Sequence, residues 1–209
     1  MNREFRDYAE QFLSRADHVA QELQGQIEKI ASVMEILFTT WIKRKWVFVT
    51  GNGGSASTAS HLAADLVKTV VENPGDPGLK ALALNDNIPL MSALTNDWGW
   101  DRVYDSQLAT FWEPESVVIA ISVNGGAGKD KAGLYSQNLV RALKFAKDHG
   151  GVAIGMAGNK YDGGVFKDIC DVCLVVPDGT PFQVEPFHVV LNHLITAGLK
   201  EKIRGFSPR

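Results

Sequence analysis

The sequence contains few cysteines, no long apolar run and no excess of charge of either sign. Its two cysteines, Cys170 and Cys173, lack a second pair of ligands at the spacing of a zinc site, so we interpret them as core thiols in a reducing compartment. No apolar run reaches the ~18 residues of a membrane span, and the charged N-terminus lacks the apolar segment of a signal peptide. With 21 Lys and Arg against 24 Asp and Glu, no basic surface for nucleic acid is expected. These absences favour a cytoplasmic protein that binds neither membranes nor nucleic acid.

The sequence does contain ample material for a folded core. Its 209 residues are 45% hydrophobic and 22% charged, the values of an ordinary globular protein with one domain of the larger kind. Apolar residues recur at helical spacing in two stretches within residues 4–44, which predicts two amphipathic helices. We interpret residues 1–45 as a helical arm that packs on the domain or on a partner subunit, within a single domain of residues 1–209.

Beyond residue 45, short apolar runs alternate with helical stretches, which is typical of a parallel sheet covered on both faces. The predicted strands are Trp46–Thr50, Lys80–Leu84, Ser116–Ile121, Val152–Gly155 and Asp171–Val176. We therefore predict an α/β fold of the flavodoxin-like, doubly wound kind: a three-layer sandwich with a central parallel five-stranded sheet, preceded by the N-terminal helices. Ligands of such folds bind at the carboxyl ends of the strands, so the loops after the first and third strands are the expected binding loops.

The loop after the first strand runs from Gly51 to Ser55 with the sequence Gly-Asn-Gly-Gly-Ser and opens a helix. Glycines let the backbone approach an anion, the free N–H groups at the helix start point at it, and Ser55 adds a hydroxyl. Two other interpretations are a plain turn and the dinucleotide fingerprint formed by Gly51, Gly53 and Ala56. The fingerprint also requires an acidic residue at the end of the second strand, and Glu72 precedes that strand, so no nucleotide cofactor is expected.

The loop after the third strand is also small and polar. It contains Ser122 and Asn124, and a Gly-rich stretch leads from there to a helix that begins near Ser136. Two such loops on neighbouring strand ends can hold one phosphate between them. Within this stretch Gly128-Lys129 is similar to part of a P-loop, but Asp130 stands where a Ser or Thr is required, so we reject nucleoside triphosphate binding.

Histidines and carboxylates occur together on two predicted helices. His61 and Asp65 stand four residues apart on the helix that the first loop opens, so they share a face. The last helix is predicted to begin at Thr180–Gln183 with a capping box and a proline at its first position, and it carries Glu185 and His193. A His–carboxylate pair binds a metal ion or transfers protons, and it also occurs as a plain surface pair; the spacing leaves these alternatives open.

Five motifs in combination resemble those of the sedoheptulose-7-phosphate isomerases, also called phosphoheptose isomerases, from the N-terminal helices to Leu199. The motifs are Gly51-Asn-Gly-Gly-Ser55, His61-Leu-Ala-Ala-Asp65, Asn96-Asp97-Trp98-Gly99-Trp100, Ile121-Ser122 and the histidine pair His188 and His193. The resemblance implies a SIS domain and a homotetramer with active sites between subunits. It also implies conversion of sedoheptulose 7-phosphate to D-glycero-D-manno-heptose 7-phosphate by enediol proton transfer, as a step in heptose synthesis for lipopolysaccharide or capsule.

The resemblance further implies roles for individual residues. The substrate- and phosphate-binding residues would be Asn52, Gly53, Gly54, Ser55, Asn96, Asp97, Ser122, Asn124 and Ser136. The metal ligands, for one zinc ion per subunit where zinc is bound, would be His61, Asp65, Glu185 and His193. The catalytic pair would be Asp65 and His193, because an isomerase of this kind needs a base beside the carbonyl carbon and an acid for its oxygen.

The sequence departs from the family pattern at several of these positions. Asp65 replaces a glutamate, Glu185 replaces a glutamine, and Asn124 replaces a serine. Thr69 is the residue nearest to a missing arginine, and extra residues are inserted before Ser136. The inserted stretch, residues 125–135, lies where it would touch the sugar, so the exact substrate does not follow from the resemblance.

Two other functions remain as alternatives. One is a non-catalytic SIS protein that binds a sugar phosphate or a protein partner, as the initiator-associating relatives do; those relatives keep the phosphate loop and lose the acid–base pair. The other is a nucleotide-cofactor enzyme. The presence of His61, Asp65 and His193 favours the isomerase, whose expected partners are a phosphorylated sugar and further copies of this chain.

Overall fold

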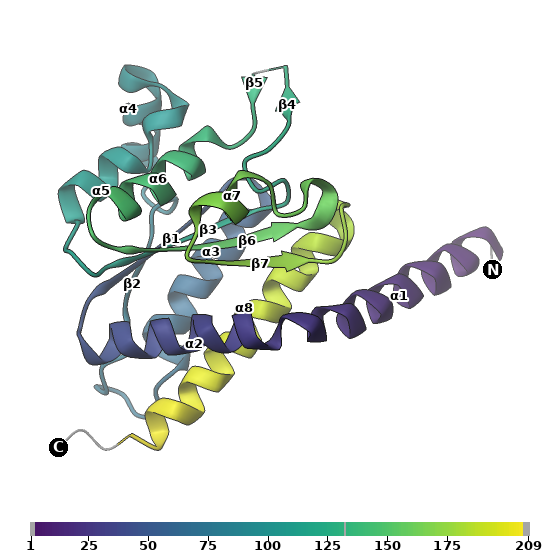
Figure 1. The fold of residues 1–209 in the computed structure, drawn as a ribbon, viewed down its shortest axis with the longest axis horizontal. Coiled ribbons are helices and arrows are strands. Elements are labelled where there is room, and N and C mark those ends of the chain that lie inside the picture. The colour runs from purple at the N-terminus through teal and green to yellow at the C-terminus, as the bar shows by residue number, and fades with distance from the viewer. Residues whose placement is uncertain (1–2, 132, 207–209) are drawn as a thin grey trace.

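Five parallel strands form the central sheet in the computed structural model, which describes residues 3–131 and 133–206 (Figure 1). The strands are β1 Trp46–Gly51, β2 Lys80–Ala83, β3 Val117–Ser122, β6 Val152–Gly158 and β7 Val172–Val176. Their order is β2-β1-β3-β6-β7 and every pair is parallel. This is the flavodoxin-like order, in which the chain reverses direction across the sheet at β1 and β3. The α/β fold and all five predicted strands are confirmed.

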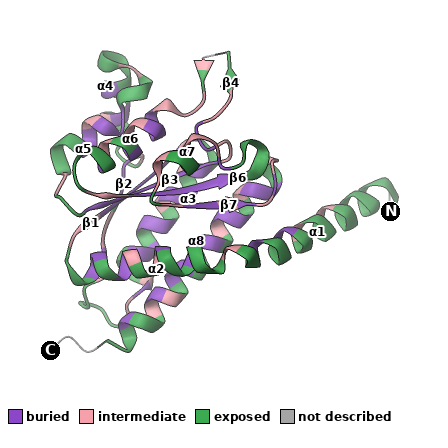
Figure 2. Ribbon diagram, viewed as in Figure 1, coloured by how far each residue is buried: buried purple, intermediate pink, exposed green. Residues whose placement is uncertain are grey.

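Helices cover both faces of the sheet and bury two hydrophobic clusters (Figure 2). The first face carries α2 Ile27–Ile42, α3 Gly54–Ala64 and α8 Pro181–Arg204, and the second carries α4 Ile88–Trp98, α5 Asp105–Phe111, α6 Gln137–Asp148 and α7 Gly164–Ile169. Along β1, Val47 and Val49 enter the cluster on the first face, whereas Phe48 enters the cluster on the second. Successive side chains of a strand point to opposite faces, so a strand that is apolar throughout must be covered twice.

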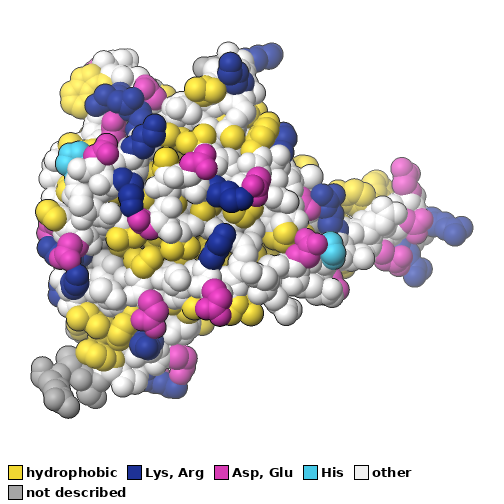
Figure 3. All heavy atoms as spheres, in the orientation of Figure 1, with side chains coloured by type: hydrophobic (Ala, Val, Ile, Leu, Met, Phe, Trp, Pro, Cys, Tyr) yellow, Lys and Arg dark blue, Asp and Glu magenta, His cyan; other side chains and the backbone are white. Residues whose placement is uncertain are grey.

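The N-terminal helices, α1 Arg3–Leu23 and α2, are joined by a short 3₁₀ turn, Gln24–Gln26. The side-chain amide of Gln26 accepts a hydrogen bond from the N–H of Val175 (2.9 Å) and donates one to its carbonyl, so this turn covers the free edge of β7. Beyond the turn, α1 projects from the body of the molecule, and hydrophobic side chains are visible along it (Figure 3). The predicted pair of helices is confirmed, and only the second of them packs fully on the sheet.

A small hairpin interrupts the chain between β3 and α6. Its strands, β4 Lys129–Asp130 and β5 Gly133–Leu134, pair antiparallel and project beyond the sheet (Figure 1). Position 132, within the expected loop 125–135, lies outside the described residues. Sequence reasoning predicted only a Gly-rich connection here, because two-residue strands show no periodicity.

The last helix begins at Pro181, directly after Thr180, as predicted, but the predicted capping box is wrong. The Thr180 hydroxyl donates to Asp178 Oδ1 (2.9 Å), and the Gln183 amide donates to the carbonyl of Phe12 (3.2 Å). A nearby carboxylate is a stronger acceptor than a backbone group, and the contact with α1 holds Gln183 away from the helix start.

Among the described residues, the helices include none with the length and hydrophobicity that a membrane span requires.

Candidate active site

The loop between β1 and α3 has the geometry expected of an anion-binding turn. A Cβ placed on Gly51 would lie 2.4 Å from the carbonyl oxygen of Ser55, so this position admits only glycine. The Ser55 N–H donates to the carbonyl of Asn52 (3.1 Å), and the Ser55 side chain is buried in the first turn of α3. Helix α3 begins at Gly54, so its free N–H groups face the space beyond the end of β1.

Two residues that the sequence did not identify hold this loop in place. The side-chain amides of Asn52 and Asn138 form a reciprocal pair of hydrogen bonds (3.0 and 2.9 Å), and Asn138 is fully buried in the first turn of α6. The hydroxyl of Tyr104 donates to the carbonyl of Gly51 (2.7 Å), and burial raises the pKa of this phenol, which keeps it protonated as a donor. The sequence does show an asparagine, Asn138, two positions after Ser136 at a predicted helix start. It does not show that Asn52 is the hydrogen-bond partner of Asn138.

The second loop lies beside the first because β1 and β3 are neighbours, with Gly51 paired to Ile121. Ser122 is buried at the last position of β3. Ser136 has a left-handed backbone conformation (φ 50°) and directly precedes α6, the helix whose Asn138 bonds the first loop. Asn124, which stands between Ser122 and Ser136 in the sequence, is half-buried. The fold thus brings the two predicted phosphate loops to one edge of the sheet, at the point where the chain reverses direction.

His61, Asp65 and His193 form one group between α3 and α8. Asp65 Oδ2 lies 3.4 Å from His61 Nε2 and 3.7 Å from His193 Nδ1, and the two imidazole rings meet edge to face with centroids 4.9 Å apart. Asp65 is only 9% exposed, whereas the side chains of His61 and His193 are 42% and 60% exposed. A buried carboxylate therefore faces two imidazoles that solvent or a substrate can reach.

The same three side chains fit a divalent metal ion. One potential ligand atom from each of them lies within 4.8 Å of the others. Two imidazoles and a carboxylate, with a fourth position left for substrate or water, form a common donor set of catalytic zinc.

Glu185, the fourth expected ligand, lies elsewhere. Among the described residues it does not belong to the group of potential ligands, and its carboxylate packs against Gly54, where an added Cβ would lie 2.7 Å from Glu185 Oε2. Its negative charge stands at the N-terminus of α3, which favours an anion. Glu185 thus lies next to the first phosphate loop and outside the group of His61, Asp65 and His193.

Two further expected residues, Asn96 and Asp97, lie on α4 on the second face, whereas His188 lies on α8 on the first face. Asn96 and Asp97 are exposed near the end of α4, and the Asn96 amide donates to Asp97 Oδ1 (2.7 Å). His188, in contrast, is completely buried in α8; this burial lowers its pKa to about 4, and the backbone of Ala157 offsets the effect only in part. His188 is therefore a neutral core residue.

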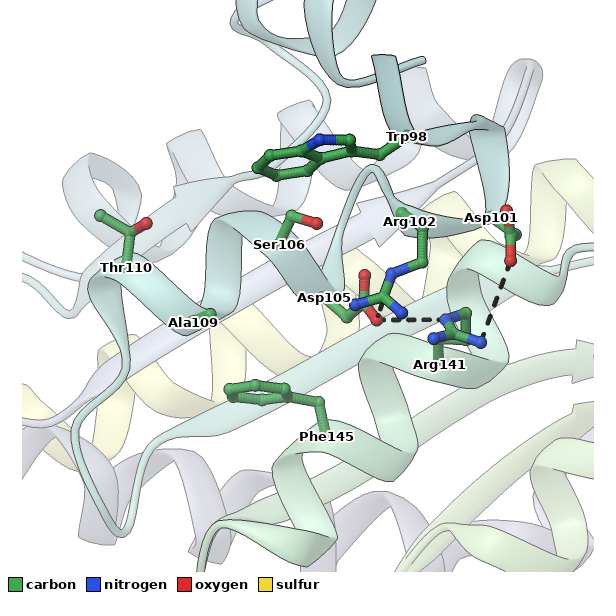
Figure 4. A pocket seen from close by; sticks show the side chains of 9 residues that line it. All are labelled: Trp98, Asp101, Arg102, Asp105, Ser106, Ala109, Thr110, Arg141 and Phe145. Carbon is green, nitrogen blue, oxygen red and sulfur yellow. Dashed lines mark hydrogen bonds and ion pairs between the residues drawn. The ribbon is translucent and has the colours of Figure 1, made fainter. Parts of the chain in front are cut away.

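A cavity of about 820 Å³ opens among α4, α5 and α6 (Figure 4). Its lining residues are Trp98, Asp101, Arg102, Asp105, Ser106, Ala109, Thr110, Arg141 and Phe145. Both guanidinium groups are paired with Asp105 Oδ2, at 3.3 Å from Arg102 Nε and 3.1 Å from Arg141 Nε. None of the expected site residues lines this cavity, so it is separate from the phosphate loops and the histidine pair.

Comparison with known proteins places the chain in a family. The model of the SIS domain matches residues 7–158. The phosphoheptose isomerase of Aliarcobacter butzleri is 32% identical over 88% of this chain and 91% of its own length, and that of Geotalea daltonii is 34% identical over 90% of each chain. The lincomycin biosynthesis protein LmbN of Streptomyces lincolnensis is 39% identical over 77% of this chain, which spans only 58% of LmbN.

Solved structures agree with this assignment at the level of the fold. The phosphoheptose isomerase of Neisseria gonorrhoeae superposes with a TM-score of 0.82 over 94% of this chain and 99% of its own, at 23% identity. That of Francisella tularensis has a TM-score of 0.81 over 93% and 97% of the two chains, at 20% identity. The chain belongs to the SIS-domain proteins and, among them, to the phosphoheptose isomerase family.

Proposed function

We propose that this protein is an aldose–ketose isomerase that converts sedoheptulose 7-phosphate to D-glycero-D-manno-heptose 7-phosphate. The observation that carries the proposal is the buried carboxylate of Asp65, directly after the helix that the anion loop opens. It faces the imidazoles of His61, on that helix, and of His193, on α8. A phosphate held at the start of α3 places the rest of the sugar along that helix, toward this group. The names of the family members support the same substrate.

The phosphate of the substrate binds between the two loops. Ser55 and Ser122 donate their hydroxyls, Asn124 and Ser136 bind from the second loop, and the backbone of residues 52–54 contributes N–H groups. Asn52 is held in place for this by its amide pair with Asn138. We also assign Asn96 and Asp97 to the sugar end of the substrate, on the strength of the family resemblance.

Isomerisation proceeds by proton transfer through an enediol. Asp65 removes a proton from C1 of the ketose, while His193 gives a proton to the carbonyl oxygen on C2, so that a C1–C2 double bond forms. His193 then takes the proton of the C1 hydroxyl, and protonated Asp65 returns a proton to C2, which gives the aldose and restores both groups.

A zinc ion, one per subunit, fits this group of residues. We propose that His61, Asp65 and His193 hold it, with Glu185 as a ligand only if its side chain leaves Gly54. When bound, the metal supplies Lewis-acid polarisation of the substrate oxygens. The residues of this chain still perform the proton transfers and bind the phosphate.

We further propose that residues 1–209 form one SIS domain and that the protein assembles as a homotetramer in the cytoplasm. The exposed apolar side chains of α1 support an interface with other copies of the chain. In this setting the product would enter the synthesis of heptose for lipopolysaccharide or capsule.

The test is to incubate the pure protein with sedoheptulose 7-phosphate in D₂O and to follow the products by NMR. The enediol mechanism predicts an aldose heptose 7-phosphate that carries deuterium at C2, because the proton held by Asp65 exchanges with solvent. Tight binding of the sugar phosphate without any conversion would contradict the proposal and support the non-catalytic alternative.

A further inference from the structure

Asp65 begins a π-helical turn, Asp65–Thr69, directly after α3. The N–H of Val70 donates to the carbonyl of Asp65 (3.2 Å), five residues earlier, in place of the four-residue spacing of an α-helix. Such turns rotate the side chains that follow them relative to the rest of the helix, and they are frequent at functional sites. The turn therefore sets the direction in which the helix presents its residues around Asp65.

The segment before β2 fixes this turn from outside. The N–H of Leu79 donates to the carbonyl of Leu66 (2.9 Å), a group of the turn. A Cβ placed on Gly78 would lie 2.0 Å from the carbonyl oxygen of Val67, so the chain can run this close to the turn only with glycine at this position. The π-turn is thus a built feature of the fold that does not depend on a bound substrate.

Two polar side chains each donate a hydrogen bond to one carboxylate oxygen of Asp65. The Thr69 hydroxyl, from the end of the turn, donates to Oδ1 (2.9 Å). The Asn192 amide, from α8, donates to Oδ2 (3.4 Å), the same oxygen that faces His61 and His193. The carboxylate is therefore held at both oxygens, and its rotation about the last side-chain bond is restricted.

Asn192 is an unusual residue for its place in the core. It is fully buried, and its Oδ1 has no hydrogen-bond partner in the described part of the chain. An unpartnered buried acceptor destabilises the fold, and an apolar side chain of similar shape would avoid this. Its Nδ2 must face Asp65, since the opposite orientation would set an amide oxygen against a carboxylate. The contact with Asp65 is the interaction that an apolar residue could not make.

We infer that Asn192 and Thr69 are positioning residues that hold the carboxylate of Asp65 toward His61 and His193. The inference rests on the proposed function, in which Asp65 is the base, and it adds two residues that neither touch the substrate nor bind the metal. Both residues orient the carboxylate of Asp65 during proton transfer, so they act on the transition state of the reaction. The phosphate loops do not involve them.

The matched variants are Asn192→Leu and Thr69→Val, which keep the shape of each side chain and remove its donor. We expect kcat to fall by about 10–100-fold in each, as for partners that orient a catalytic group, with KM changed by less than about twofold. The control is Thr196→Val, since Thr196 is equally buried on α8 and donates to the backbone carbonyls of Asn192 and His193, not to the carboxylate of Asp65. The control should keep the wild-type kcat.

Crystal structures and melting curves of the same variants separate positioning from folding. Asn192→Leu should melt at or above the wild-type temperature, because it removes an unpartnered acceptor, and its Asp65 carboxylate should turn away from the two imidazoles. An Asn192→Leu variant with wild-type kcat and an unmoved Asp65 overturns the inference. If the wild type fails to isomerise sedoheptulose 7-phosphate, the proposed function fails, and the position of Asp65 in the two variant structures then decides the inference alone. If Asn192→Leu does not fold, Thr69→Val decides it in the same way.

Discussion

At the scale of single residues, the assignment of Asp65 and His193 makes the most direct prediction. Asp65→Asn keeps the size of the side chain but cannot take a proton, so kcat should fall by about 10²–10⁴-fold while binding of the sugar phosphate changes little. His193→Gln should behave likewise. Steady-state kinetics and calorimetric titration with the substrate measure the two effects separately.

The control for both variants is His149→Gln, because His149 is an exposed residue that stacks on Phe145 at the end of α6. It should keep wild-type activity. Wild-type turnover in both Asp65→Asn and His193→Gln would show that the catalytic pair is wrongly assigned.

His188 makes a prediction about stability and pH. Its pKa is about 4 in the folded protein against an ordinary value of 6.5, because burial disfavours the charged form. Between these pH values only the unfolded chain takes up the proton. The contribution of neutral His188 to the free energy of unfolding is therefore fully present above pH 6.5 and is lost as the pH decreases toward 4, by roughly 3 kcal/mol in total. Denaturant unfolding of wild type and His188→Leu at pH 7 and 5 tests this. The variant should lose less stability on acidification than the wild type; equal losses would mean that His188 does not titrate in this way.

At the scale of elements, the first phosphate loop depends on close backbone contact at Gly51. A Cβ at this position would meet the backbone of Ser55 at 2.4 Å, which cannot be relieved by a change of rotamer. Gly51→Ala should therefore destabilise the protein by about 1–3 kcal/mol and weaken phosphate binding, as measured by thermal unfolding with and without inorganic phosphate. Gly25→Ala is the matched control, since an added Cβ there meets nothing within 4 Å. If the two variants melt alike, the loop is not constrained as described.

The strands and most helices could be predicted because their signals are local. Within β3, residues 117–121 are apolar at every position, and this alone indicates a strand covered on both faces. The hairpin of Lys129–Asp130 and Gly133–Leu134 is too short to show alternation. The capping box failed for a different reason: Thr180 matches the local pattern, but Asp178, fixed by an ion pair with Arg15, takes its hydroxyl.

The active site could be predicted in its parts but not in its internal contacts. The loops and the His–Asp spacing are visible in sequence, whereas the Asn52–Asn138 pair joins residues 86 positions apart and depends on the order of the strands. Asn192 contacts Asp65 across 127 positions and looks like any polar residue of an amphipathic helix. The position of Glu185 against Gly54 likewise depends on how α8 crosses α3. Such contacts follow from tertiary packing, which periodicity does not encode.

At the scale of the whole molecule, the exposed apolar side chains of α1 have no explanation in a monomer. It has only two buried residues, Val19 and Leu23, along its 21 positions. Tyr8 and Leu13 are 65% and 67% exposed, and Phe182, at the start of α8, is 74% exposed. Hydrophobic side chains are visible along the projecting part of α1 (Figure 3). Exposed apolar surface of this kind marks an interface, so we expect α1 to be covered by other copies of the chain.

This expectation gives the last prediction, which concerns assembly. Light scattering at micromolar concentration should give the mass of a tetramer for the wild type, and a smaller assembly for Tyr8→Glu combined with Leu13→Glu, because a charge at each of these exposed apolar positions opposes its burial in an interface. The matched control is Ser14→Glu, which adds a charge at an exposed polar position of the same helix. If active sites lie between subunits, the dissociated variant also loses turnover although Asp65, His61 and His193 are unchanged. A wild-type protein that is monomeric and fully active would contradict both the interface on α1 and the shared active site.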